Sequence, residues 1–269
     1  MKSKRLNWNY DDDFFNKKSD MTEKVFDDEH PEVKNREIET SDHIAHETMD
    51  YNINYDFEYY DTLRDNINIF NKKSNSPTQL IAFIGSDYGE GVSTIVSKFG
   101  INLAMHSDDP ILIVDTNFSK PSIHNIFGAR ISPGIGEVLV NSYETKDVIQ
   151  HTSYKNLHLI CSGDVPSNPA SKFDSQTFHE ILTQWKQEYK FVLFDTPPMQ
   201  CDMKQCDMNA SVRLASLVDG VIIVIEAGQV RYEVAQNIKD RLSESHANIL
   251  GVVLNKTKYY IPQWLYKRL

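Results

Sequence analysis

Residues 81–104, IAFIGSDYGEGVSTIVSKFGINLA, decide the fold. A short apolar run leads into a turn with two glycines, residues 86–94, and the turn opens a stretch with helical spacing. Glycines in this context let backbone N–H groups turn around phosphate oxygens, and the helix N-terminus adds its dipole and unpaired donors. Taken alone, the stretch fits an ordinary glycine-rich strand-to-helix turn better than a phosphate loop. The remaining chain must decide between the two.

Beyond this stretch, short apolar segments alternate with longer helical ones. The apolar segments are rich in Ile, Val and Leu and nearly continuous, which is typical of parallel strands buried on both faces. Right-handed βαβ units follow, so we expect an α/β, P-loop NTPase-like, doubly wound, mostly parallel sheet with helices on both faces. The expected strands are residues 80–85, 111–115, 157–161, 191–195, 221–225 and 249–254, and the expected crossover helices are residues 94–106, 174–189 and 231–246.

Two of the expected strands end in an aspartate. Asp115 closes the strand that starts at Ile111, and Asp195 closes the strand that starts at Phe191. Both carboxylates then fall at the carboxyl edge of the sheet, where open α/β sheets bind their ligands. A carboxylate there can hold Mg²⁺ or its waters, or orient a nucleophile. The alternative for each aspartate is a helix or turn cap.

The chain divides into three parts. Residues 1–50 are polar and charged, with few aliphatics and no sustained period, and are expected to be a disordered acidic tail. Residues 51–78 hold an amphipathic helix, on which Tyr59, Leu63, Ile67 and Phe70 recur at helical spacing, and then a linker over residues 71–78. Residues 79–269 form the P-loop domain.

Composition and charge exclude several classes of function. The net charge is −10, and most of it lies in residues 1–78, which disfavours nucleic acid and anionic membrane surfaces as partners. No apolar run approaches the ~20 residues that span a bilayer, and the N-terminus lacks a secretory signal, so a cytoplasmic location is expected. The three cysteines, Cys161, Cys201 and Cys206, are too few for a disulfide framework and lack metal-ligand spacing.

Seven segments in order resemble the cytosolic domain of bacterial tyrosine kinases of capsule and exopolysaccharide synthesis. The resemblance covers the chain from about Glu58 to its C-terminus, and the number and order of the segments make it specific. The segments are IAFIGSDYGEGVSTIVSKFGINLA, ILIVDTNFSKPSIHNIFG, PGIGEVLV, SGDVPSNPASKF, YKFVLFDTPP, LVDGVIIVIEAGQVRYE and ILGVVLNK.

The resemblance implies roles for particular residues and a cofactor, ATP or ADP with Mg²⁺. Asp115 begins the second acidic motif of the family, Asp195 is the Walker B aspartate, and both are expected to be catalytic. Ser93, with these two aspartates, is expected at the metal. The cofactor-binding loop comprises Gly89, Glu90, Gly91, Val92, Ser93 and Thr94.

Three positions depart from the family pattern. Val92 stands where the family has the lysine that neutralises β- and γ-phosphate charge, a change expected to lower the rate by roughly 10²–10⁴. Asn117 stands at the expected second acidic position, and Ser119 replaces an arginine. Lys120, on the loop after the second strand, is better placed to substitute for the missing lysine than Lys98, which lies inside the helix and points away.

Two further segments bear on assembly. In the family, a Glu-x-x-Arg-x-x-Arg segment packs subunits into a ring; here Glu58 and Arg64 remain and Asp61 replaces the first arginine. A homo-oligomer through the helix from Glu58 to Phe70 and a simple capping helix are therefore both open. At the C-terminus, Tyr259, Tyr260 and Tyr266 are possible phosphate acceptors, and residues 262–269 are expected to form a short docked helix.

The expected function is that of a tyrosine-kinase-like P-loop protein of exopolysaccharide or capsule biosynthesis. Its catalysis is expected to be weak or absent, because Val92 replaces the lysine of a non-specific protein-tyrosine kinase. It would act as a regulatory partner of an integral membrane chain-length protein, and associate with the membrane through it. One alternative is an active ATP-dependent tyrosine autokinase. Another is a ParA/MinD-like positioning ATPase, disfavoured because its signature lysine is missing near Asp87.

Overall fold

The computed structural model describes residues 53–73, 79–140, 142–164, 169–199 and 208–257. The chain divides into two units, residues 1–57 and residues 58–269, and the second holds the sheet and all the candidate site residues. Several predictions fall outside the described residues: the acidic tail 1–50, most of the linker, Cys201, Cys206 and the C-terminal helix with its three tyrosines. These remain predictions.

The core element is a seven-stranded sheet in the order β3-β4-β2-β5-β1-β6-β7. All neighbouring strands pair in parallel except β3 and β4, which pair antiparallel at one edge. The chain runs outward from β1 to β2, returns between them as β5, and continues on the other side as β6 and β7. The strands are β1 Leu80–Gly85, β2 Ile111–Asp115, β3 Gln150–His151, β4 Leu157–Ile160, β5 Phe191–Asp195, β6 Gly220–Glu226 and β7 Ile249–Asn255.

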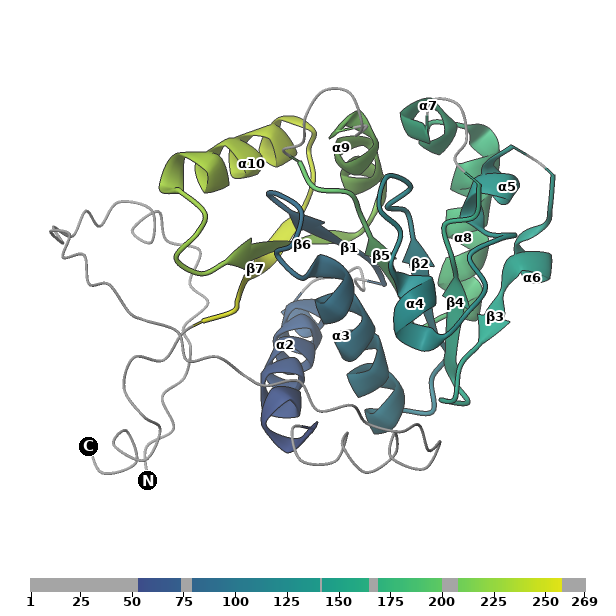
Figure 1. The fold of residues 1–269 in the computed structure, drawn as a ribbon, viewed down its shortest axis with the longest axis horizontal. Helices are drawn as coiled ribbons and strands as arrows, with labels where there is room; N and C mark the ends of the chain where they lie inside the picture. Colours follow the sequence, from purple (N-terminus) through teal and green to yellow (C-terminus); the bar gives the residue numbers. More distant parts are fainter. Residues whose placement is uncertain (1–52, 74–78, 141, 165–168, 200–207, 258–269) are drawn as a thin grey trace, which may run out of the picture. The chain divides into compact units, whose positions relative to one another are not determined.

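Helices cover both faces of the sheet (Figure 1). Alternate side chains of each strand point to opposite faces, so the apolar residues sort into two clusters. One cluster packs under α2 (Ile53–Lys73), α3 (Val92–His106) and α4 (Ile123–Phe127). The other packs under the remaining helices: α5 Ile135–Leu139, α6 Thr145–Val148, α7 Pro169–Phe173, α8 Gln176–Glu188, α9 Met208–Leu217 and α10 Tyr232–Glu244.

The predicted fold class is confirmed, with corrections at the ends of elements. The helix expected to end at Phe70 continues through Lys73, so the first three residues of the predicted linker are helical. Lys72 in its last turn carries the charge that the C-terminal end of the helix dipole favours. The two-residue strand β3 and the helices α4, α5, α6 and α7, of four or five residues each, were not predicted, because so few residues cannot display a hydrophobic period. The ten-residue helix α9 was not predicted either.

Parallel strands bring their carboxyl ends to one edge of the sheet. Asp115 at the end of β2 is the register partner of Asp195 at the end of β5. The loop after β1 begins at the same edge, because β1 pairs with β5 in parallel and Phe83 is level with Asp195. The fold therefore gathers the predicted site residues at this edge. None of the helices in the described ranges is long and apolar enough to cross a membrane.

Candidate functional site

The loop between β1 and α3 has the backbone geometry of a phosphate-binding turn. Gly89 and Gly91 have φ of 88° and 87°, a left-handed conformation that side-chain-bearing residues rarely adopt. Gly91 is also the N-cap of α3, which has no side-chain cap, and its carbonyl accepts the N–H of Ile95 at 3.0 Å. A Cβ on Gly91 would lie 2.4 Å from Nδ2 of Asn255. Glycine is therefore required there, and the N-terminus of a 15-residue helix faces the loop.

Val92 supplies packing and no charge at the first helical position. Its side chain is half-buried and packs against the same apolar cluster as α2 and α3. Its Cγ2 lies 2.8 Å from where a Cβ on Gly85 would be, so it fills the space beside the end of β1. The position where a lysine would neutralise phosphate charge is thus occupied by an apolar group that packs against the core.

Glu90 places a buried carboxylate inside the loop. Its side chain is 3% exposed and accepts hydrogen bonds from the backbone N–H and the hydroxyl of Ser86. These bonds cross the base of the loop and hold its two ends together. The Glu90 carboxylate also adds a negative charge to this loop, in which Val92 stands at the position of the family's lysine. This charge opposes the approach of a phosphate.

Asp115 serves as a backbone cap. Oδ1 accepts the N–H of Asn117 at 3.0 Å, and Oδ2 accepts the N–H groups of Ser122 and Ile123 at 3.2 Å each. Burial raises the pKa of Asp115 to about 6, and these three bonds partly oppose the rise. The cap alternative for this residue is therefore present in the structure, where it fixes the start of α4.

Asp195 has different surroundings. It is fully buried, and both carboxylate oxygens lack a well-formed hydrogen bond to any described residue. Burial raises its pKa well above the usual range, the charge of Asp115 raises it further, and the nearby Ser93 hydroxyl lowers it in part. A buried carboxylate without partners is expensive unless a cation or its waters complete it. The residue therefore fits a magnesium site, and the cap alternative does not apply to it.

Mg²⁺ at this edge would need ligands beyond the protein. No group of three or more His, Cys, Asp and Glu side chains gathers as a metal site within the described ranges. Asp195 and the Ser93 hydroxyl fit a cation that keeps waters and also meets phosphate oxygens, which is the usual way that Mg²⁺ binds. Thr94, by contrast, is exposed at the helix surface.

Asn117 and Lys120 form the loop after β2. Asn117 is 6% exposed, and its side-chain oxygen accepts the N–H of Lys120 at 3.2 Å. The amide at the predicted second acidic position is therefore part of a turn. Lys120 Nζ lies 5.7 Å from the centre of the Tyr88 ring, so the lysine named as a possible substitute does reach the phosphate loop.

Two residues that the sequence did not single out contact the loop from β7. Asn255 Nδ2 donates to the carbonyl of Glu90 at 2.6 Å. Lys256 Nζ donates to the carbonyl of Gly89 at 2.7 Å and to Oε2 of Glu226 at 2.8 Å. Their position at the end of the last strand, at the carboxyl edge of the sheet, was the signal that could have identified them.

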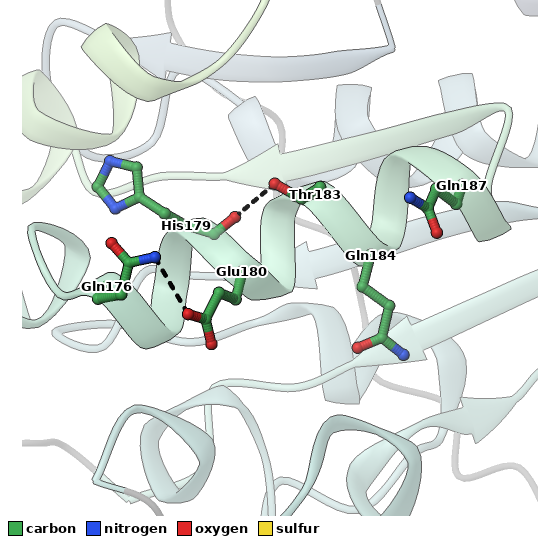
Figure 2. A pocket seen from close by; sticks show the side chains of 6 residues that line it. All are labelled: Gln176, His179, Glu180, Thr183, Gln184 and Gln187. Atoms are coloured by element: carbon green, nitrogen blue, oxygen red, sulfur yellow. Dashed lines mark hydrogen bonds between the residues drawn. The ribbon is translucent and has the colours of Figure 1, made fainter.

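A polar pocket on α8 lies apart from this edge (Figure 2). Gln176 donates to Glu180 at 3.0 Å and the Thr183 hydroxyl donates to the carbonyl of His179 at 2.9 Å, both along the helix. All its lining residues come from this one helix, and no phosphate loop or strand end reaches it. The pocket has no share in the predicted chemistry.

The helix α2 is fastened to α3 by the residue that departs from the family pattern. Asp61 accepts a hydrogen bond from Nδ2 of Asn102 at 2.9 Å, and its carboxylate lies 3.0 Å from Arg64 and 3.6 Å from His106. Arg64 therefore pairs within its own helix. Tyr59 and Ile69 remain 58% and 50% exposed on the same helix.

Comparison with known proteins agrees with the geometry. A family model described as an AAA domain matches residues 78–249. The chain belongs to the AAA domain family. Within the AAA-domain region lie the phosphate loop and both edge aspartates. The chain is similar to the tyrosine-protein kinase YwqD of Bacillus subtilis, with 27% identity over 201 residues that cover 75% of this chain and 81% of YwqD.

Other relatives point the same way. The tyrosine-protein kinase CpsD of Streptococcus agalactiae is 26% identical over 200 residues, covering 74% of this chain and 82% of CpsD. Among solved structures, the chimerical protein CapA2B2 has a TM-score of 0.68 at 27% identity, over 75% of this chain and 85% of that one. The resemblance of this AAA-domain chain to bacterial tyrosine kinases is therefore confirmed.

A more distant structure shows the fold alone. MinD of Pyrococcus horikoshii, solved with Mg-ADP, has a TM-score of 0.54 at 19% identity, over 71% of this chain and 76% of that one. At this level of identity the likeness shows the P-loop fold of this chain and nothing of its function.

Proposed function

We propose that this chain is a tyrosine-kinase-like nucleotide-binding protein of exopolysaccharide or capsule biosynthesis, with weak or absent phosphotransfer. The observation that carries the proposal is the contrast between two positions at one sheet edge. Asp195 is a fully buried carboxylate without a well-formed hydrogen bond among the described residues, while position 92 holds a partly buried valine packed against the core. The site therefore keeps a carboxylate suited to Mg²⁺, Asp195, but has no lysine at position 92 to neutralise phosphate charge.

Weak nucleotide binding follows from what remains. The left-handed glycines and the N-terminus of α3 supply backbone donors, and Asp195 with Ser93 suits Mg²⁺. ADP or ATP with Mg²⁺ is therefore the proposed cofactor. Asp115 and Asp195 are the proposed catalytic positions. Asn117, at the expected second acidic position, cannot act as a base, because an amide accepts no proton near neutral pH.

The proposed role is regulatory, through an integral membrane chain-length protein bound as a separate chain. The two exposed apolar side chains on α2, Tyr59 and Ile69, provide a further surface for self-association. Neither role requires phosphotransfer.

Calorimetric titration with Mg-ADP and Mg-ATP tests the cofactor. We expect weak binding of both that disappears when Mg²⁺ is removed, because Asp195 has no other cation. Complete absence of binding at millimolar nucleotide would overturn the nucleotide part of the proposal.

An active tyrosine autokinase is the second candidate, and one observation favours it. Lys120 lies over Tyr88 of the phosphate loop, so a cation is within reach of the loop mouth. In this case Lys120→Met abolishes tyrosine phosphorylation, whereas in the first case there is little phosphorylation to lose.

A further inference from the structure

Two consecutive residues at the end of β7 form hydrogen bonds with the backbone of the phosphate loop. The side chains of Asn255 and Lys256 each donate to a loop carbonyl, at 2.6 Å to Glu90 and at 2.7 Å to Gly89. The two carbonyls are consecutive along the loop. Each contact spans more than 160 residues of sequence, so the loop is held by the opposite end of the domain.

The lysine is held in place by its own surroundings. Glu226, at the end of β6, accepts a hydrogen bond from Lys256 Nζ at 2.8 Å, and the Lys256 N–H donates to Asn255 Oδ1 at 2.9 Å. Lys256 has a φ of 53°, in the left-handed region that residues with a side chain rarely adopt. Such strain persists where the surrounding contacts fix it.

A cation on a loop carbonyl acts on the phosphate side of the same peptide. Lys256 binds the carbonyl of Gly89, and the N–H of that peptide belongs to Glu90; Asn255 binds the carbonyl of Glu90, and that N–H belongs to Gly91. Hydrogen bonding at the oxygen polarises the peptide and makes its N–H a stronger donor. The positive charge itself also offsets the buried carboxylate of Glu90.

An ordinary surface ion pair would have little effect. The Lys256 and Glu226 side chains are 48% and 24% exposed, and such a partly exposed ion pair alone contributes little to stability. The additional bond to Gly89, the neighbouring bond from Asn255 and the left-handed backbone distinguish this lysine from a solvated one.

We infer that Lys256, oriented by Glu226, is a positioning residue of the phosphate loop and supplies the positive charge that Val92 does not. The ligand in this inference, the phosphate groups of a nucleotide, rests on the proposed function. The positioning of the loop by Lys256 is independent of that function.

Hydrogen exchange without nucleotide tests the positioning. Lys256→Met keeps the apolar length and removes the charge, Lys256→Arg keeps the charge, and Lys190→Met, at an exposed lysine on the opposite edge of the sheet, is the control. We expect exchange over residues 86–94 to rise about threefold or more in Lys256→Met, to be largely restored in Lys256→Arg and to be unchanged in the control. Unchanged exchange in Lys256→Met overturns the inference.

Mg-ADP affinity tests the charge, through a double-mutant cycle with Val92→Lys. Lys256→Met should weaken binding about five- to tenfold in the native background and less than about twofold when lysine stands at position 92. An equal loss in both backgrounds, or none in the native one, overturns the charge role. If the native chain binds no Mg-ADP, the proposed function fails, and the exchange result still decides the positioning. If Lys256→Met folds poorly, Glu226→Gln tests the same inference, because it leaves the lysine in place and should still raise hydrogen exchange in the loop.

Discussion

Asp115 and Asp195 are register partners at the ends of adjacent parallel strands, and the two carboxylates meet opposite surroundings. Three backbone N–H groups reach Asp115, whereas both Asp195 oxygens are buried without a well-formed bond among the described residues. Their charges repel each other, which contributes to the raised pKa of Asp195. The pair is thus destabilising in the free protein and favours a cation at Asp195.

Replacing Asp195 by asparagine should stabilise the metal-free protein at neutral and alkaline pH. A carboxyl whose pKa is raised by folding gives full stability below its unfolded pKa, and this stability is lost as the pH rises through the folded pKa. Asp195→Asn escapes that loss. We expect its melting temperature at pH 8 to exceed that of the native chain by about 3 °C, the shift that roughly 1 kcal/mol gives at this size.

The control for this prediction is pH itself. At pH 4 the native carboxyl is already neutral, so the two proteins should melt together. Millimolar Mg²⁺ at pH 8 should raise the melting temperature of the native chain and leave Asp195→Asn unchanged. A difference between the two proteins that is independent of pH would contradict the assignment of a buried, uncompensated charge.

The fold and most of the site could be read from the sequence because both rest on local patterns. Buried parallel strands are continuous apolar runs, so β1, β2 and β5 were predicted to the residue, and Asp115 and Asp195 at their ends followed from them. Lys256 could not be found this way. Its contact with Gly89 depends on the register of β7 and on a left-handed backbone, and neither leaves a pattern in neighbouring residues.

The roles of Asp115 and Asp61 show a second limit. The sequence left open whether Asp115 and Asp195 were ligands or caps, since an aspartate serves both purposes. Only the three N–H groups around one carboxylate, and their absence around the other, separate Asp115 from Asp195. The role of Asp61 could not be predicted either. Its hydrogen bond with Asn102 joins α2 to α3, and the spacing of residues within each helix does not show which residues of the two helices meet.

Restoring lysine at position 92 should strengthen nucleotide binding. Val92→Lys should lower the dissociation constant for Mg-ADP by about 10-fold or more, since one charge-assisted contact to phosphate contributes on the order of 1.5–3 kcal/mol. Val92→Met is the matched control, because it extends the side chain without adding charge. Affinity in Val92→Lys equal to that in Val92→Met would show that the loop is wrongly assigned.

Phosphotransfer should be near background in the native chain. Purified protein with Mg-ATP should show little or no phosphotyrosine, because positions 92 and 117 both lack the expected charged groups. The double variant Val92→Lys, Asn117→Asp should give more signal than either single variant. Strong autophosphorylation of the native chain, lost in Asp195→Asn and in Lys120→Met, would instead establish the active kinase.

Asp61 should stabilise the packing of α2 on α3. Its carboxylate accepts from Asn102, a fully buried amide, so Asp61→Ala leaves that donor unpaired and should lower the free energy of unfolding by about 1–3 kcal/mol. Asp65→Ala is the control: Asp65 lies on the same helix and contacts the same arginine, but it is 65% exposed, so little change is expected. Equal effects in urea denaturation would show that the bond to Asn102 contributes nothing.

Partner binding should survive the loss of the metal site. A regulatory chain needs its fold and surface more than phosphotransfer, so Asp195→Asn should bind the membrane chain-length protein as well as the native chain does. Deleting α2 is a poor probe of assembly, because Ile67 is 4% exposed and its loss would open the core. Tyr59→Ser with Ile69→Ser changes two largely exposed side chains, and should weaken self-association while leaving the melting temperature within about 2 °C.

The measurement is a pull-down from detergent-solubilised cells that express the polysaccharide locus, probed for the chain-length protein and run beside light scattering of the purified variants. Recovery of the partner with the native chain and with Asp195→Asn, and its loss with a denatured control, is the expected pattern. Because a regulator acts through its partner, a deletion strain should also change polymer length. If the pull-down recovers no partner and polymer length is unchanged in the deletion strain, the regulatory proposal is wrong. Nucleotide binding would then serve another activity.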